Sequence, residues 1–210
     1  MPQTRFGLGE LFEEIEMKRL LTYLTGALCL ALTPVSHAGA QPALVIQVPE
    51  SFYQHPVRLL NPYFVYWHNR AEIAESVGLN SFQAQHYTTS SCQAEAQGQA
   101  LVVIEPNMFY NPQTGVFYSE ITARVYNTSA ADSALGKPLM TVKGEGQSRG
   151  WLTYNVENFA RQSYQQAFEQ VIQKIQQNPA YEPSVVAAPV QTYQALCNSI
   201  DTLSQPKALF

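Results

Sequence analysis

The sequence contains few cysteines, few charged residues and no long apolar run. Three of its 210 residues are cysteines, 13% are charged, and the formal net charge is −4. The low cysteine count excludes a disulfide-rich scaffold, and the acidic balance excludes the basic patch that a nucleic-acid-binding surface requires. The most apolar segment, residues 20–32, is shorter than the ~18 residues that a membrane-spanning helix needs.

Residues 17–40 have the organisation of a secretory leader. Lys18 and Arg19 precede the apolar segment, and small side chains around Ala38–Ala40 offer cleavage sites of the kind that a signal peptidase reads. We therefore expect a signal peptide over residues 17–40 and a mature protein that is periplasmic or secreted. The alternative is an internal membrane anchor, which the short apolar segment disfavours.

Residues 1–16 do not fit the start of such a leader. They carry four acidic residues and one basic residue, whereas the amino-terminal region of a leader is positively charged. We therefore expect them to be an upstream extension that results from a mis-assigned start, with translation in a bacterium beginning at Met17.

The three cysteines have different predicted fates. Cys29 follows Leu28, where a lipid-attachment site requires a small residue, so it is expected to leave with the leader. Cys92 and Cys197 then remain in an oxidising compartment, which predicts a disulfide bond between them. Free thiols or a catalytic cysteine are the alternative, but no histidine lies in an evident companion motif.

After the leader, residues 41–178 are predicted to form a single α+β domain. Apolar and alternating runs predict strands, and apolar residues at steps of three and four predict amphipathic helices. The strands are expected at 43–48, 100–104, 116–126 and 138–145, and the long helices at 63–77 and 156–177. This order favours a three- to four-stranded, mostly antiparallel sheet with both helices on one face. Residues 179–210 are expected to be an extended tail with a short helix, tied back by the disulfide.

Residues 98–177 carry a recognisable succession of elements. An apolar strand and an alternating strand ("GQALVVIEPNMFYNPQTGVFYSEITARVYN") are followed by a strand with a glycine-rich exit ("GKPLMTVKGEGQSRGW") and a long helix. This succession resembles the periplasmic α/β domain of the curli-pore lipoproteins, the amino-terminal domain of TolB and similar small envelope lipoproteins. The resemblance implies a non-enzymatic envelope component that contacts other proteins, and it transfers no functional residues.

The alternating strand 116–126 predicts an interaction surface. Its inward residues are Phe117, Ile121, Ala123 and Val125. Because the helices are expected to cover only one face of the sheet, the residues of opposite parity remain available to a partner. They are Tyr118, Glu120, Thr122, Arg124 and Tyr126.

A dense aromatic segment suggests a second binding region. Tyr63, Tyr66 and Trp67 lie in the first predicted helix, which has more aromatic residues than one buried stripe accommodates. Tyrosine and tryptophan suit protein contacts and stacking against sugars. A glycan or a small molecule is therefore a possible ligand of this cluster.

The sequence also contains candidate residues for enzymatic and metal-dependent functions. Glu105 and Glu120 flank the predicted hairpin and could act as the acid and base of a glycan hydrolase, but cross-strand ion pairs explain them more simply. The chain has no G-x-S-x-G motif and no Walker A motif. The histidines after the leader, His55, His68 and His86, do not form a ligand set. The sequence predicts no metal, no cofactor and a non-enzymatic envelope module whose partners are envelope proteins.

Overall fold

The computed structural model describes residues 41–92, 96–127 and 136–203. The predicted upstream extension, the signal peptide and Cys29 lie outside these residues. In the part of the chain that is described, no helix is both long enough and apolar enough to span a membrane.

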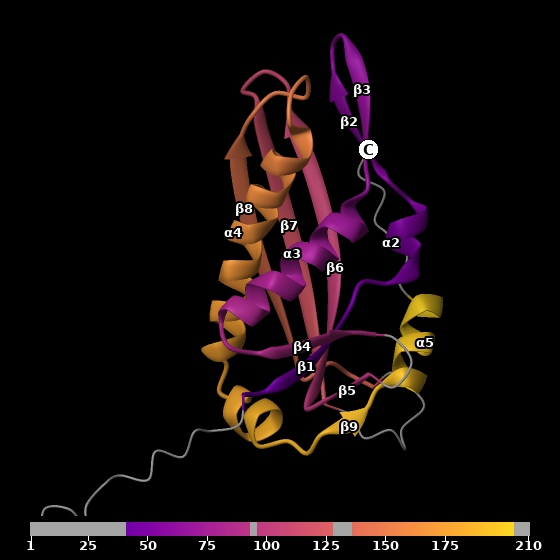
Figure 1. The fold of residues 1–210 in the computed structure, drawn as a ribbon, viewed down its shortest axis with the longest axis vertical. Helices are drawn as coiled ribbons and strands as arrows, with labels where there is room; N and C mark the ends of the chain where they lie inside the picture. The colour runs from indigo at the N-terminus through magenta and orange to yellow at the C-terminus, as the bar shows by residue number, and fades with distance from the viewer. Residues whose placement is uncertain (1–40, 93–95, 128–135, 204–210) are drawn as a thin grey trace, which may run out of the picture. The chain divides into compact units, whose positions relative to one another are not determined.

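The centre of the fold is a five-stranded mixed sheet with the order β4-β1-β6-β7-β8 (Figure 1). These strands are β1 (Ala43–Gln47), β4 (Thr88–Ser91), β6 (Ala100–Asn111), β7 (Val116–Tyr126) and β8 (Met140–Arg149). The pairs β6–β7 and β7–β8 are antiparallel, as predicted, whereas β1 pairs in parallel with both β4 and β6. The predicted three- to four-stranded, mostly antiparallel sheet was therefore wrong in strand number, and only two of the four strand pairs are antiparallel.

The long β6–β7 hairpin is closed by the sequence Asn-Pro-Gln-Thr-Gly. Gly115 adopts a positive φ of 63°, which glycine accepts without steric cost. The Asn111 side chain accepts a hydrogen bond from the backbone N–H of Gln113 at 2.9 Å. The turn thus fixes the register in which Phe109 lies opposite Tyr118.

Two helices, α3 (Arg70–Ala84) and α4 (Val156–Gln176), pack on one face of this sheet. The predicted helix at 156–177 is confirmed, because its apolar stripe faces the sheet and its glutamines face outward. The main core between helices and sheet includes Ile104, Phe117, Ile121, Tyr164 and Phe168.

Helix α4 lies unusually close to β8 because two glycines of that strand face it. A Cβ atom on Gly144 would lie 2.0 Å from the carbonyl oxygen of Ala167, and one on Gly146 would lie 1.9 Å from that of Ser163. Such separations are well inside van der Waals contact, so no other residue fits at either position without moving α4. The glycine-rich strand exit is therefore a packing surface, not a phosphate-binding loop.

Gly146→Ala is expected to lower the free energy of unfolding by about 1–3 kcal/mol, the range found for overpacked sites. Gln147→Ala is the matched control, because Gln147 is the next residue and is exposed on the opposite face. Its expected effect is within about 0.5 kcal/mol. Urea denaturation of the two variants measures both values, and equal transition midpoints would contradict the close packing of α4 on β8.

Residues 57–68 form a hairpin and not the first part of the predicted helix at 63–77. Strand β2 (Val57–Asn61) pairs with β3 (Phe64–His68), and α3 begins only at Arg70. The Asn61 side chain accepts a hydrogen bond from the backbone N–H of Tyr63 at 3.0 Å, which closes the turn. The predicted helix start at residue 63 was wrong, because an asparagine side chain that bonds two residues ahead makes a tight turn.

The tail that was predicted to be extended from residue 179 contains more regular secondary structure than expected. It contains a short π-helical turn η1 (Glu182–Val186), strand β9 (Gln191–Thr192), which pairs with β5 (Gln97–Gly98), and helix α5 (Gln194–Leu203). The remaining helix, α2 (Glu50–Gln54), follows β1.

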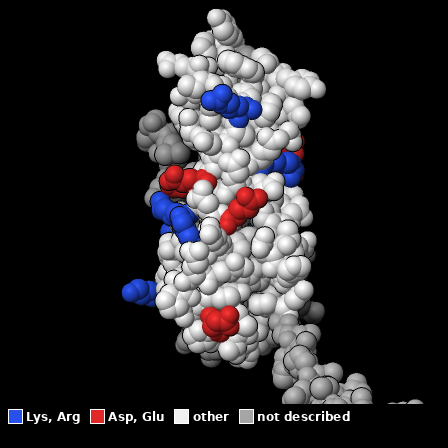
Figure 2. All heavy atoms as spheres, turned by 90° about the vertical axis from the view of Figure 1, so that its left-hand side faces the viewer, with Lys and Arg blue, Asp and Glu red and all other residues white. Residues whose placement is uncertain are grey.

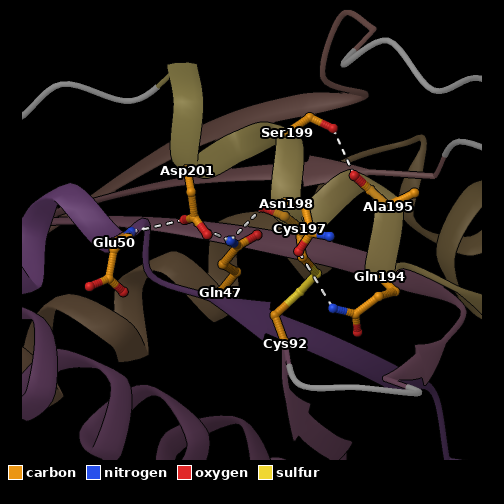
Figure 3. The surroundings of a disulfide bond; sticks show 9 residues. All are labelled: Gln47, Glu50, Cys92, Gln194, Ala195, Cys197, Asn198, Ser199 and Asp201. Carbon is orange, nitrogen blue, oxygen red and sulfur yellow. Dashed lines mark hydrogen bonds between the residues drawn. A yellow bond between two sulfur atoms is a disulfide. The ribbon is translucent and has the colours of Figure 1, made fainter.

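Helix α5 packs on the sheet face opposite α3 and α4. Its contacts form a second hydrophobic cluster in which Leu196 and Ile200 cover Val45, Leu101 and Tyr126. The predicted disulfide is confirmed, with Cα atoms of Cys92 and Cys197 6.2 Å apart. The Asp201 carboxylate also accepts hydrogen bonds from the Gln47 side chain at 3.1 Å and the Glu50 backbone N–H at 2.9 Å (Figure 3).

Candidate functional site

The face opposite α3 and α4 is open only where α5 does not reach. We call this part the open sheet face and define it by the residues Asn107, Phe109, Tyr118, Glu120, Glu145 and Gln147. They come from β6, β7 and β8 and lie in register, with Phe109 opposite Tyr118 and Glu120 opposite both Asn107 and Glu145. Strand alternation directs all of them away from the helices.

A shallow hollow lies on the open sheet face. It has a volume of about 240 Å³, and its lining includes Asn107, Phe109, Tyr118, Glu120 and Glu145. The Phe109 and Tyr118 rings form a tilted pair with centroids 6.2 Å apart. The hollow therefore combines an apolar wall of two rings with two carboxylates, and it can hold a ligand or partner side chain that has both an apolar and a hydrogen-bonding part.

The two carboxylates of the hollow differ in their partners. Glu120 accepts a charge-assisted hydrogen bond from the Lys143 ammonium at 3.3 Å. Glu145 is exposed, and among the residues that the structure describes no Lys, Arg or His side chain lies within ion-pair distance of it. Glu145 is thus the carboxylate that is available to an incoming cationic or hydrogen-bond-donating group.

Of the five predicted surface residues, the structure leaves three accessible. Tyr118 is exposed, and Glu120 and Arg124 are half-buried. Thr122 and Tyr126 are buried, with 7% and 4% of their surface exposed. Tyr126 lies in the cluster beneath α5, so the expectation that this end of the strand is open was wrong.

The site residues that β6 and β8 contribute were not identified from the sequence. The predicted strand stopped at Ile104, whereas β6 continues through Pro106 to Asn111. Extending the alternation past the proline would have placed Asn107 and Phe109 on the same face as Tyr118 and Glu120. Glu145 is the last residue of the predicted strand 138–145. It is two residues from Lys143, so alternation places both side chains on the same face of the sheet.

The proposed acid and base, Glu105 and Glu120, lie on one face but form separate ion pairs. Glu105 is opposite Thr122, two residues from Glu120 along the strand, and is bonded to the Arg124 guanidinium. Glu120 is bonded to Lys143. Each carboxylate thus has a basic partner on a neighbouring strand, which is an arrangement of cross-strand ion pairs.

The outer edge of β8 is occupied by side chains of α4. Gln170 accepts from the Glu145 N–H at 3.3 Å and donates to the Glu145 carbonyl at 2.8 Å, and Gln166 accepts from the Gln147 N–H at 3.2 Å. The Lys174 ammonium donates to the Lys143 carbonyl at 2.5 Å. These side chains satisfy backbone groups that an edge strand otherwise offers to another chain. The edge of β8 therefore offers fewer free backbone groups for pairing with another strand than its face offers side chains.

The predicted aromatic cluster is not assembled into one site. Tyr63 and Trp67 are exposed by 91% and 61%, whereas Tyr66 is half-buried and packs against the core. Because Tyr66 and Trp67 are neighbours in β3, their side chains point to opposite faces of the hairpin.

The histidines occupy three separate environments. His55 is exposed and bonds to the Ser51 carbonyl, His68 is buried, and His86 follows α3 with a φ of 63°. Among the described residues, no group of three or more His, Cys, Asp or Glu side chains is placed to hold a metal ion.

No protein-family model and no curated protein matches the chain. Among solved structures, the PelC dodecamer from Paraburkholderia phytofirmans is similar with a TM-score of 0.36 and 12% sequence identity, over 60% of this chain and 85% of that chain. A variant of the same dodecamer gives a TM-score of 0.35 and 12% identity, over 61% and 86% of the two chains. Similarity this weak carries no argument about what this chain does.

Proposed function

We propose that this protein is an exported, non-enzymatic binding module of the bacterial envelope and that its open sheet face contacts an envelope protein. The observation that carries the proposal is the hollow that Phe109, Tyr118, Glu120 and Glu145 line. Tyrosine is among the residues that most often dominate binding energy in protein interfaces, and Glu145 offers a carboxylate to a basic side chain of a partner. The leader predicted over residues 17–40 supplies the location.

The hydrolase alternative requires a free acid and a free base at one site. Glu105 and Glu120 instead form ion pairs with Arg124 and Lys143. A binding role does not require these carboxylates to be free. The two ion pairs link neighbouring strands and fix the positions of the charged side chains on the sheet face. The pairing therefore favours binding over hydrolysis.

Site-specific crosslinking in living cells tests this proposal. A photoreactive amino acid in place of Gln147 lies on the open sheet face opposite Tyr118, beside the hollow, and the same group in place of Gln173 lies on the outer side of α4 as the matched control. We expect one discrete crosslinked protein from position 147 and none from position 173. Tyr118→Ala is expected to reduce that product about tenfold, because loss of a central aromatic anchor costs about 1–3 kcal/mol of binding.

The competing functions predict other results. A hydrolase would lose all turnover of envelope glycan in the Glu120→Gln variant, whereas a binding module shows no such turnover before or after the change. Crosslinks of equal yield from positions 147 and 173 would contradict the assignment of the open sheet face.

A further inference from the structure

Large apolar side chains are exposed in two segments at one end of the fold. Of the eleven large hydrophobic residues that are exposed among the described residues, six belong to the β2–β3 hairpin and to the loop between β8 and α4. We call these six residues the aromatic end. They are Leu60, Tyr63, Val65, Trp67, Trp151 and Tyr154.

The hairpin presents one apolar face that the fold does not use. Leu60 pairs with Val65 and Arg58 pairs with Trp67, so these four side chains share one face. Leu59 and His68, which have the opposite parity, are 2% and 0% exposed. The inner face thus holds the hairpin on the core, and the outer face has no structural task within the described residues.

The second segment reaches the same end of the fold through the β6–β7 turn. A Cβ atom on Gly115 would lie 3.4 Å from the Trp151 ring, so the indole lies against that turn. Tyr154 follows within the same loop and is 78% exposed. In Figure 1 the β2–β3 hairpin, the β6–β7 turn and the start of α4 all lie at the upper end of the drawing.

The segments that form this end contain no acidic residue up to Val156, although the chain as a whole is acidic; the next residue, Glu157, lies in the first turn of α4 and is paired with Arg161 at 2.8 Å. The segments 51–71, 106–119 and 146–156 contain no Asp or Glu, and they contain Arg58 and Arg149, which are both exposed. In the view of Figure 2 no acidic side chain is visible at the upper end, and a basic one lies close to it. The end of the fold that exposes the most apolar surface is therefore also less acidic than the rest of the chain.

We propose that the aromatic end binds the surface of a lipid bilayer that contains anionic phospholipids. Trp and Tyr prefer the interface between headgroups and acyl chains. Arginine side chains close to an anionic surface are attracted to it, and the Leu60–Val65 pair supplies aliphatic surface next to the Arg58–Trp67 pair.

The shape of the aromatic end favours lipid over a folded protein partner. Tyr63, Tyr154 and Trp67 are exposed by 91%, 78% and 61%, so their rings protrude into solvent. A protein partner needs a complementary pocket for each protruding ring. A fluid bilayer interface accepts such side chains in any arrangement, because lipids reorganise around them.

The lipid surface is separate from the contact surface proposed above. The hollow on the open sheet face is lined by none of the six residues of the aromatic end. A protein held to a bilayer by this end keeps the sheet face free, so both contacts are compatible and can be tested independently.

The two tryptophans of the chain provide the readout, because both belong to the aromatic end. The purified protein is titrated with vesicles of phosphatidylethanolamine and phosphatidylglycerol, and with vesicles of phosphatidylcholine alone. We expect a blue shift of tryptophan emission, quenching by brominated acyl chains, and co-sedimentation that is at least tenfold stronger with the anionic vesicles and decreases with salt.

Variants separate this proposal from a general affinity for vesicles. Trp67→Ala combined with Trp151→Ala is expected to reduce co-sedimentation at least tenfold, and Arg58→Glu is expected to remove the preference for anionic lipid. Phe109→Ala, an exposed aromatic of the open sheet face, is the matched control and is expected to bind vesicles like the parent protein. Circular dichroism confirms that each variant is folded.

Three results would overturn the proposal. The first is tryptophan emission that vesicles do not change. The second is vesicle binding that the double tryptophan variant retains. The third is a concentration-dependent dimer, lost in the double variant, without any vesicle binding, which would assign the aromatic end to contact with a second copy of the chain.

Discussion

Reduction of the Cys92–Cys197 disulfide is expected to lower the free energy of unfolding by about 4–5 kcal/mol. The two cysteines are 105 residues apart. In the chain-entropy model a bond that closes a loop of this length removes about that much conformational free energy from the unfolded state. This loss is comparable to the whole stability of many single domains, about 5–15 kcal/mol.

Helix α5 is the element that depends most directly on this bond. It has ten residues, from Gln194 to Leu203, and helices shorter than about 12–15 residues are marginal by themselves. The disulfide, the Asp201 hydrogen bonds and the contacts of Leu196 and Ile200 hold it over the sheet. Without the disulfide, Val45 and Tyr126 are expected to become accessible to solvent.

Urea denaturation with and without a thiol reductant measures the effect. The double variant Cys92→Ser with Cys197→Ser is the control, since its transition midpoint should match that of the reduced protein and should not respond to the reductant. Hydrogen exchange of α5 gives an independent measure, and faster exchange is expected there first. A transition midpoint that reduction does not change would contradict the stabilising role of the bond.

The parts of the fold that the sequence predicted are those with a strong local signal. Strand 116–126 alternates cleanly over its length, and the stripe of helix 156–177 continues for six turns at steps of three and four. The disulfide followed from counting, because Cys92 and Cys197 are the two cysteines that remain after the predicted leader.

The parts that the prediction missed depend on contacts distant in the sequence. Residues 88–91 are Thr-Thr-Ser-Ser, which has no apolar alternation, and they become β4 only because β1 offers them a parallel partner. The aromatic residues from Tyr63 to Trp67 fit a helix and a hairpin equally well, and packing of Leu59 and Tyr66 on the core selects the hairpin.

Only part of the candidate site was predicted, for a similar reason. Alternation alone identifies which residues share a face, so Tyr118 and Glu120 were found. It does not indicate how much of that face another element covers. Helix α5 returns from the far end of the chain to cover Tyr126, and β6 runs past a proline to bring Phe109 to Tyr118.

Acidification between about pH 6.5 and pH 4 is expected to destabilise the protein through His68. Its side chain is fully buried, and burial together with the nearby Arg70 guanidinium lowers the pKa of His68 from 6.5 to about 4. Nε2 lies 3.3 Å from the Tyr164 hydroxyl, and no partner for Nδ1 is found among the described residues. The imidazole is therefore held neutral in the folded state.

The direction of the effect follows from proton binding in the two states. Between pH 6.5 and pH 4 the unfolded chain binds a proton at His68 and the folded chain does not, so falling pH favours unfolding. The loss is about 2 kcal/mol at pH 5 and approaches about 3 kcal/mol at pH 4. Well above pH 6.5 this histidine contributes no pH dependence, because it is neutral in both states.

The His68→Gln variant isolates this contribution from that of every other titrating group. Glutamine has no charge to gain and keeps a polar atom near the Tyr164 hydroxyl, so the slope of unfolding free energy against pH should decrease between pH 6.5 and pH 4. His55→Gln is the matched control, because His55 is exposed and its loss should leave that slope unchanged. Urea denaturation of the three proteins at pH 7.5, 5.5 and 4.5 gives the slopes. If the parent and His68→Gln lose the same free energy between pH 7.5 and pH 4.5, then His68 takes up its proton equally well in both states and its burial does not exclude the charge.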